Sequence, residues 1–240
     1  MVNILIPACG GTDFFEDCFY PKNLYEIKGQ PMIQRVVENY STVHNAKFIV
    51  VLLQEECNKF HTDNVVSLIA DEFTEVIRLK SLTCGGLCSC LMGIEYINND
   101  NELIISNNDQ LIDINFEDVL SEFRKENADC GVICFKAVHP RWSYIKTDGV
   151  SVIETAEKRP IAHQAIAGFY YFKKGTEFVE AAKRAIRKGS TCNGKYYITA
   201  ALNEMILMNK DIRVYNIKNE AYHSFYMPER IRQYENGENL

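Results

Sequence analysis

The feature that most constrains the fold is the alternation of short apolar runs with helical patterns in the first half of the chain. Short apolar runs predict buried strands, and apolar residues spaced three or four apart predict helices. The predicted strands cover residues 2–7, 47–53, 75–79 and 102–106, and the predicted helices cover residues 31–41, 63–73, 86–97 and 115–127. Strands that alternate with helices are typical of βαβ units, so we expect a parallel sheet with helices on both faces.

The second half differs, because its strand-like runs follow one another over short links, which favours antiparallel pairing. Strands are predicted over residues 131–136, 143–147, 149–154, 165–172 and 211–217, and helices over residues 175–189 and 197–209. No linker or repeat separates the two halves. We therefore predict one α/β domain of Rossmann-like, three-layer α/β/α architecture, with a mixed, mainly parallel central sheet and a small antiparallel extension.

The predicted domain covers residues 1–236, and residues 237–240 are expected to be a disordered tail or part of a tag. A net charge of -6 argues against a general nucleic-acid binder. No apolar stretch approaches the roughly 20 residues that a membrane-spanning helix needs. The nine cysteines include no CxxC pair, which favours reduced thiols in a cytoplasmic protein. The sequence therefore predicts no nucleic-acid or membrane partner.

A candidate phosphate loop follows the first predicted strand, in the stretch IPACGGTDFFEDCFYPKNL. Gly10 and Gly11 would let backbone N–H groups approach phosphate oxygens, and the hydroxyl of Thr12 adds a donor. Lys22 follows a proline and has a compact ammonium group that suits a phosphate. The two glycines could equally form a tight turn without a ligand, and Lys22 could equally be a solvated surface residue.

A candidate magnesium ligand follows the strand ELIIS, in the stretch NNDQ. Asp109 is a carboxylate at the end of a buried strand, with Asn107, Asn108 and Asp113 nearby. Mg²⁺ takes oxygen ligands, often one or two carboxylates together with substrate phosphates. The alternative is a polar loop, since asparagine and aspartate favour turns.

Two further features of the second half could contact a ligand. Glu157 and Lys158 are adjacent in AEKRP, and in a regular strand only one of them would face a cleft. Gly168, at the start of GFYYF, would allow close approach of a ligand or mark a bulge. A surface ion pair is the alternative for Glu157 and Lys158.

Taken together, these stretches resemble the sugar-1-phosphate nucleotidyltransferase family, and more narrowly a subgroup from capsule and surface-polysaccharide loci. The resemblance runs over roughly residues 3–235. It rests on IPACGGT, YPKNLYEIKGQPMIQRVVEN, TCGG, LIISNNDQ, FKAVHPRWSYI, ETAEKRPI, AGFYYFKKG, NGKYYITAALNEMI and MPERI. It implies a cytoplasmic enzyme that couples a nucleoside triphosphate to a sugar 1-phosphate or similar phosphomonoester and releases pyrophosphate.

The resemblance also implies roles for individual residues. The implied catalytic residues are Lys22, Asp109 and Lys158, and Asp109 is the implied ligand of Mg²⁺ or Mn²⁺. Glu157 and Gly168 are implied on the acceptor side. The implied nucleotide-binding residues are Ala8, Cys9, Gly10, Gly11, Thr12, Gly85 and Asn108. A homo-oligomer is a further expectation.

Three departures from the family pattern are visible. The family loop G-x-G-[ST]-R reads GGTD here, one residue shorter, with Asp13 at the arginine position. The family's G-T-P-E reads YMPE. The position of a second metal-binding aspartate falls at Ser224 or His223. Two alternatives therefore stand beside the active enzyme: a degenerate relative that binds nucleotide or sugar phosphate without turnover, and a GT-A-type glycosyltransferase.

Overall fold

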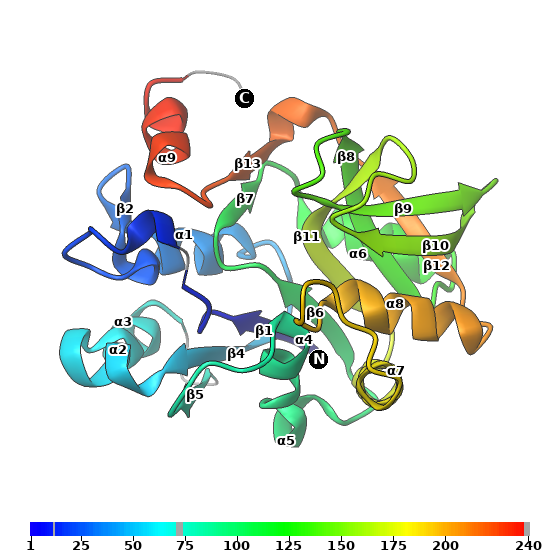
Figure 1. Ribbon diagram of the computed structural model, residues 1–240, viewed down its shortest axis with the longest axis horizontal. Coiled ribbons are helices and arrows are strands. Elements are labelled where there is room, and N and C mark those ends of the chain that lie inside the picture. Colours follow the sequence, from blue (N-terminus) through cyan, green and yellow to red (C-terminus); the bar gives the residue numbers. More distant parts are fainter. Residues whose placement is uncertain (12, 71–73, 238–240) are drawn as a thin grey trace.

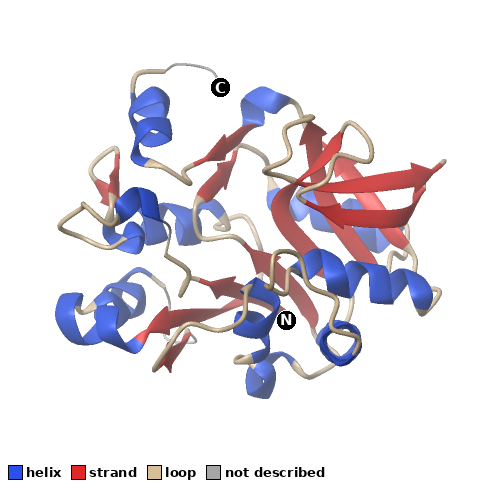
Figure 2. Ribbon diagram, in the orientation of Figure 1, coloured by secondary structure: helices blue, strands red, loops and turns tan. Residues whose placement is uncertain are grey.

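The computed structural model describes residues 1–11, 13–70 and 74–237. Its centre is a nine-stranded mixed sheet in which the order β10-β9-β11-β6-β1-β4-β5 is joined by β8 and β12 on the other edge of β11. Helices lie against both faces of this sheet (Figures 1 and 2). The predicted α/β architecture, with a mixed sheet and a small antiparallel extension, is confirmed.

The strands form one large sheet and two small ones. The strands of the large sheet are β1 (Val2–Pro7), β4 (Ala46–Leu53), β5 (Glu75–Leu79), β6 (Glu102–Ser106), β8 (Cys130–Lys136), β9 (Ser143–Asp148), β10 (Ser151–Glu157), β11 (Gln164–Phe172) and β12 (Ile212–Asn216). The small sheets pair β2 (Glu26–Ile27) with β3 (Gln30–Pro31) and β7 (Gln110–Ile112) with β13 (Tyr222–Ser224).

The helices are mostly short. The α-helices are α1 (Met32–Asn39), α2 (Gln54–Phe60), α3 (Thr62–Ile69), α4 (Gly86–Leu91), α5 (Ile94–Ile97), α6 (Phe116–Lys125), α7 (Gly175–Arg187), α8 (Ile198–Leu207) and α9 (Pro228–Glu235). The 3-10 helices are η1 (Asp13–Phe15), η2 (Lys22–Leu24) and η3 (Asn219–Ala221).

The first half forms the parallel part of the sheet. β1 pairs in parallel with β4 on one side and β6 on the other, and β5 extends the sheet beyond β4. β1, β6 and the second half of β4 are buried on both faces, which explains why they read as continuous apolar runs, whereas the edge strand β5 is mostly half-buried. Their parallel course brings the carboxyl ends of β1 and β6 to the same edge of the sheet.

The second half supplies the antiparallel part. β11 runs antiparallel to β6 on one edge and to β8 on the other, and β9 and β10 form a hairpin that branches from the start of β11. Figure 1 shows this hairpin projecting beside α8. The predicted strand at residues 211–217 is β12, which pairs in parallel with β8.

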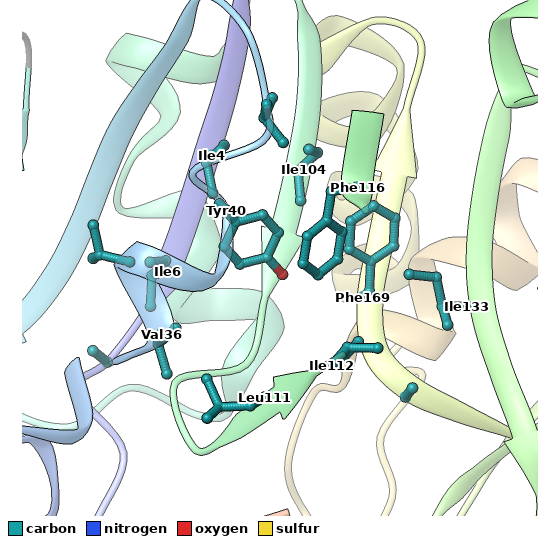
Figure 3. Packing of buried hydrophobic residues seen from close by; sticks show 14 of the residues in the cluster. Ile4, Ile6, Val36, Tyr40, Ile104, Leu111, Ile112, Phe116, Ile133 and Phe169 are labelled. Atoms are coloured by element: carbon teal, nitrogen blue, oxygen red, sulfur yellow. The ribbon is translucent and has the colours of Figure 1, made fainter. Parts of the chain in front are cut away.

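Two hydrophobic clusters cover the two faces of the sheet. One includes Ile4 and Ile6 of β1 with residues of α1, α3 and α6, and the other includes Leu5 with residues of α4, α5, α7 and α8. Alternate residues of a strand point to opposite faces, so β1 contributes to both clusters. In the first cluster Tyr40 stacks on Phe116 at 4.3 Å between ring centroids, and Phe116 stacks on Phe169 at 5.5 Å (Figure 3).

Two predicted helices differ from the structure. The helix predicted over residues 86–97 is two short helices, because the chain bends at Gly93, where a β-carbon would lie 3.3 Å from the side chain of Leu5. The helix predicted over residues 63–73 begins at Thr62 and ends at Ile69, and residues 71–73 lie outside the described part. The helix predicted over residues 115–127 is α6, and Asn115 caps its start, since its side chain accepts a hydrogen bond from Glu117 N at 3.0 Å.

Four features were not predicted: α2, α9, the β2–β3 hairpin and the β7–β13 pair. The β7–β13 pair matters most, because it brings a segment near the C-terminus beside the turn that follows β6. All nine cysteines are free thiols. In the described part of the chain no helix has the length and apolarity needed to cross a membrane.

Candidate active site

The site begins where β1 and β6 end side by side. Their parallel register pairs Leu5 with Ile105, so Ala8 and the turn Asn107–Asp109 follow at the same edge of the sheet. Ligands of open α/β sheets bind at the carboxyl ends of the strands. The two stretches chosen from the sequence, ACGGT and NNDQ, therefore meet at this edge.

The central contact is an ion pair between Lys22 and Asp109. Lys22 Nζ lies 3.1 Å from Asp109 Oδ2 and donates a second hydrogen bond to Asn108 Oδ1 at 3.3 Å. The lysine side chain is only 7 % exposed, whereas that of Asp109 is 20 % exposed. A lysine buried to this degree is no solvated surface residue, so that reading of YPKNL is wrong.

Asn23, the neighbour of Lys22, ties the two stretches together. Its Nδ2 donates to Ala8 O at 2.8 Å and to Glu56 Oε2 at 3.0 Å, and its Oδ1 accepts from Asn108 Nδ2 at 2.8 Å. Desolvation raises the pKa of Glu56, while the hydrogen bond from Asn23 opposes the rise. Because buried amides need partners, this network fixes the turn after β6 against the turn after β1.

The loop after β1 places Cys9 inward and its glycines outward. Cys9 is buried and its Sγ donates to Ser89 Oγ at 3.2 Å. Gly10 and Gly11 are exposed, and a β-carbon on either would meet no described atom within 4 Å. Thr12 and the side chain of Asp13 lie outside the described part, so the predictions about them stay predictions.

Gly85 holds a second loop close to the site. Its φ of 120° is in the region that favours glycine, and a β-carbon there would lie 2.8 Å from the backbone nitrogen of Tyr196. The same loop is bonded to that segment, since Tyr196 N donates to Cys84 O at 2.8 Å and Leu87 N donates to Tyr196 O at 3.1 Å. A side chain at position 85 would separate the two segments.

Gly168 marks both a bulge and a close approach. Its φ is 58°, and the pairing of β11 with β8 shifts register between Ile166 and Tyr170. Its carbonyl accepts from Asn107 N at 3.0 Å and from Gln110 Nε2 at 3.0 Å. A β-carbon would come within 2.8 Å of the Asn107 side chain. The glycine thus lets β11 pass directly beneath the turn that carries Asp109.

Glu157 and Lys158 both reach the site, contrary to the regular-strand expectation that only one would. β10 ends at Glu157 and Lys158 adopts a φ of 53°, which breaks the alternation of the strand. Glu157 Oε2 accepts from Ser143 Oγ at 2.6 Å and from Thr199 Oγ1 at 3.1 Å. Desolvation raises the pKa of Glu157, and a hydrogen bond with Tyr197 raises the pKa of Lys158.

One cavity of about 310 Å³ joins these groups. Asp109 lies on its wall together with Glu157, Lys158 and Gly168, which come from the other half of the chain. A larger hollow of about 620 Å³ continues from Glu157 and Lys158 between β10 and α8. Lys22 and Asn108 lie behind Asp109, held by the ion pair and the amide network. The structure therefore brings Asp109 and the residues predicted on the acceptor side to one cavity, whereas none of the described residues predicted to bind the nucleotide lines it.

The donor set fits a divalent cation held by one carboxylate. Asp109 faces the cavity, and Ser224 is placed beside it because β13 pairs with β7 and Phe225 N donates to Asp109 O at 2.7 Å. Asp113 does not assist, because it pairs with His223 at 2.8 Å and its side chain is 61 % exposed. Within residues 1–11, 13–70 and 74–237 no group of three or more His, Cys, Asp or Glu side chains could hold a metal. Mg²⁺ commonly takes one protein carboxylate and completes its shell with substrate phosphates and water.

Arg141 and Trp142 also line the cavity, although neither was predicted to belong to the site. Arg141 Nη1 donates to the hydroxyl of Tyr226, and the guanidinium carbon lies 5.1 Å from the Trp142 ring centroid and 5.0 Å from that of Tyr226. The segment HPRWSY offered one signal, an arginine next to the only tryptophan of the chain.

Comparison with known proteins bears on the family of the chain. Residues 18–220 match the family model described as nucleotidyl transferase. The chain is 27 % identical over 209 residues to the bifunctional protein GlmU of Methanocaldococcus jannaschii, a match that covers 84 % of this chain and 45 % of that protein. The chain therefore spans less than half the length of that curated relative.

Solved structures share the fold at low sequence identity. A nucleoside-diphosphate-sugar pyrophosphorylase from Vibrio cholerae RC9 superposes with a TM-score of 0.84 at 20 % identity, over 97 % of this chain and 99 % of that one. A UDP-glucose pyrophosphorylase solved with UDP-glucose gives a TM-score of 0.79 at 19 % identity, over 99 % and 98 % of the two chains. The sheet and its helices are thus those of the sugar pyrophosphorylase fold.

Proposed function

We propose that this chain, which belongs to the nucleotidyl transferase family, couples a nucleoside triphosphate to a sugar 1-phosphate or similar phosphomonoester. The observation that carries the proposal is the single cavity that has Asp109 on one wall and Glu157 and Lys158 on the other. The nucleoside-diphosphate-sugar and UDP-glucose pyrophosphorylases that share its fold support the choice of substrates.

The reaction is an in-line displacement at the α-phosphorus. A phosphate oxygen of the acceptor forms the new P–O bond, the bond to the bridging oxygen breaks, and pyrophosphate leaves with the electron pair. Such a transfer needs positioning and charge neutralisation rather than a covalent enzyme intermediate. Lys22 is close enough to Asp109 to neutralise charge at the α-phosphate. Lys158, on the opposite wall, would hold the attacking phosphate, and Glu157 would accept hydroxyl hydrogens of the acceptor.

Asp109 would hold Mg²⁺ or Mn²⁺, which would supply further charge neutralisation at the phosphates. In the structure the ammonium group of Lys22 forms an ion pair with Asp109 Oδ2. When a nucleotide binds, the phosphate oxygens give the ammonium group a stronger partner, and the carboxylate is then available to the cation. Ser224 stands beside Asp109 where the family resemblance implies a second carboxylate, so substrate oxygens complete the ligand set.

The proposed setting is the cytoplasm, where the product would serve as an activated precursor of surface polysaccharide. The support is the resemblance of the motifs from IPACGGT to MPERI. Its partners would be the two small-molecule substrates and, in a homo-oligomer, further copies of the chain.

The test is a substrate panel with a pyrophosphate readout. Each of the five common nucleoside triphosphates is incubated with Mg²⁺ or Mn²⁺ and a series of phosphorylated sugars and polyols. We expect pyrophosphate release that requires both substrates. Nucleotide binding by calorimetry without release would instead identify a binding protein without turnover, and release of a nucleoside diphosphate from a nucleotide sugar would identify a glycosyltransferase.

A further inference from the structure

A side pocket of about 170 Å³ adjoins the active-site cavity. Arg141, Trp142, Tyr222, Ser224 and Tyr226 line both spaces, so a ligand in the cavity lies against side chains that also form the pocket. The described residues that line it lie within residues 135–142 and 219–230, which belong to the second half of the chain.

The pocket is basic, although the protein as a whole carries a net charge of -6. Lys136, Arg141 and Arg230 contribute three cationic side chains, and none of the described lining residues is acidic. Within the described residues none of the three makes an ion pair with a carboxylate; Arg230 Nη1 donates to the neutral amide of Gln233 at 3.1 Å. Cations without carboxylate partners beside an active site create a positive potential that attracts an anion.

Among the described residues, the groups that hold Arg141 in place carry no negative charge. Its guanidinium lies against the rings of Trp142 and Tyr226, and it donates to the hydroxyl of Tyr226. Its Nε is buried and has no hydrogen-bond partner among the described residues. A buried N–H without a partner is costly, and the planar guanidinium group suits bidentate recognition of carboxylate or phosphate.

We infer that this basic side pocket selects an acceptor that carries a second anionic group, a carboxylate or phosphate, in addition to the phosphate that attacks the nucleotide. The inference rests on the proposed function for its assignment to the acceptor. The acceptor is favoured over the triphosphate because none of the described residues that line the pocket comes from the nucleotide half, whereas Glu157 and Lys158 line the adjoining cavity.

The only tryptophan of the chain, Trp142, lines the pocket and reports on it directly. Its emission is followed while the protein is titrated with two matched esters, 3-phosphoglycerate and glycerol 3-phosphate, which differ in a carboxylate. We expect the wild-type protein to bind the carboxylated ester about tenfold or more tightly, as a charge-assisted pair allows. Arg141→Ala and, on the surface helix α9, Arg230→Gln should each remove most of this preference.

Arg232→Ala is the matched control, because Arg232 lies on the same helix but pairs with Glu229 at 3.2 Å outside the pocket. It should keep the preference. Equal binding of the two esters, binding of neither, or a preference that survives both pocket variants would overturn the inference. Arg141→Ala is also tested for nucleoside triphosphate binding by calorimetry. If it binds the triphosphate more weakly and the esters unchanged, the pocket belongs to the triphosphate and the inference is wrong. The titration needs no turnover, so its failure is distinct from failure of pyrophosphate release.

Discussion

The two sides of the active-site cavity differ in whether their polar groups have partners within the protein. On the nucleotide side, Lys22, Asn23, Asn108 and Asp109 hydrogen-bond to one another and to Ala8 O. On the acceptor side, Arg141 keeps a buried Nε without a described partner, and the side pocket gathers cations without carboxylates.

This difference separates the two tasks of a transferase. Groups that neutralise charge in the transition state act best when they are held in place before the substrate arrives. Groups that select a substrate act through the penalty of leaving them unpaired when the wrong molecule binds. The nucleotide side is therefore expected to control turnover, and the acceptor side is expected to control which phosphomonoester is used.

Replacing the buried lysine should have the largest effect. Lys22→Ala removes the cation next to Asp109, and we expect turnover to fall by about 10²–10³-fold, as for loss of one preorganised electrostatic group. The measurement is the initial rate of pyrophosphate release at saturating substrates. Lys125→Ala, on the exposed surface of α6, is the control and should keep the wild-type rate. Near-wild-type turnover of Lys22→Ala would contradict the expectation that the nucleotide side controls turnover.

The close approach of β11 to the turn that carries Asp109, at Gly168, can be tested by measuring the stability of a variant. Gly168→Ala forces a β-carbon into the Asn107 side chain at a φ of 58°, and we expect a loss of about 2–4 kcal/mol in the free energy of unfolding. Gly149→Ala is the matched control, since its φ is 67° but a β-carbon would meet no described atom within 4 Å. The control should lose about 1 kcal/mol in urea denaturation. Equal losses would show that the close approach at position 168 is unimportant.

Glu157, the buried carboxylate of the acceptor side, should affect how the free energy of unfolding depends on pH. Desolvation raises the pKa of Glu157 above 4.5, so the folded protein binds this proton more tightly than the unfolded chain does. Stability then falls as the pH rises from about 4.5 through the folded pKa. Glu157→Gln should make this fall shallower in urea denaturation series, whereas the exposed control Glu122→Gln should follow the wild type. Parallel curves for Glu157→Gln and the wild type would contradict the assignment.

Removing the hydrogen bond between Tyr40 and Ser106, beneath the nucleotide side, should have the smallest effect. The Tyr40 hydroxyl donates to Ser106 Oγ at 2.7 Å directly below the turn that carries Asp109 (Figure 3 shows the ring). Tyr40→Phe keeps the aromatic stack and removes this bond, for an expected loss of about 1 kcal/mol in thermal or urea unfolding. Tyr20→Phe, at an exposed tyrosine, should be neutral. No loss for Tyr40→Phe would mean that the turn needs no support from the core.

Most of the sheet could be predicted from the sequence, because its central parallel strands β1, β4 and β6 have buried stretches that read as continuous apolar runs. The pairing of β7 with β13 could not, since three-residue strands carry no periodicity and their partners lie more than a hundred residues apart. The break at Gly93 was also missed, because a single glycine inside a helical pattern is often tolerated.

The candidate site was predicted unevenly. Asp109 and Glu157 stand at or just after strand ends, Lys22 begins the 3-10 helix η2, and Gly168 lies within the apolar run of β11. A polar residue after an apolar run, or a glycine within one, is a local signal. Arg141 carries no such signal, because its importance comes from long-range neighbours, Tyr226 above all. The network around Asn23 is likewise visible only in three dimensions, since it joins four separate segments.

The central claim is that Asp109 and Lys22 form the centre of nucleotidyl transfer. Asp109→Asn tests it most directly, because the amide preserves the shape and removes the charge that holds the cation. Pyrophosphate release is measured over a Mg²⁺ titration with the best substrates from the panel. The account predicts a fall in turnover of about 100-fold or more at every Mg²⁺ concentration, in a protein that still unfolds in one cooperative transition at a lower urea concentration, because Lys22 loses its charged partner. Turnover and Mg²⁺ dependence that match the wild type would contradict it.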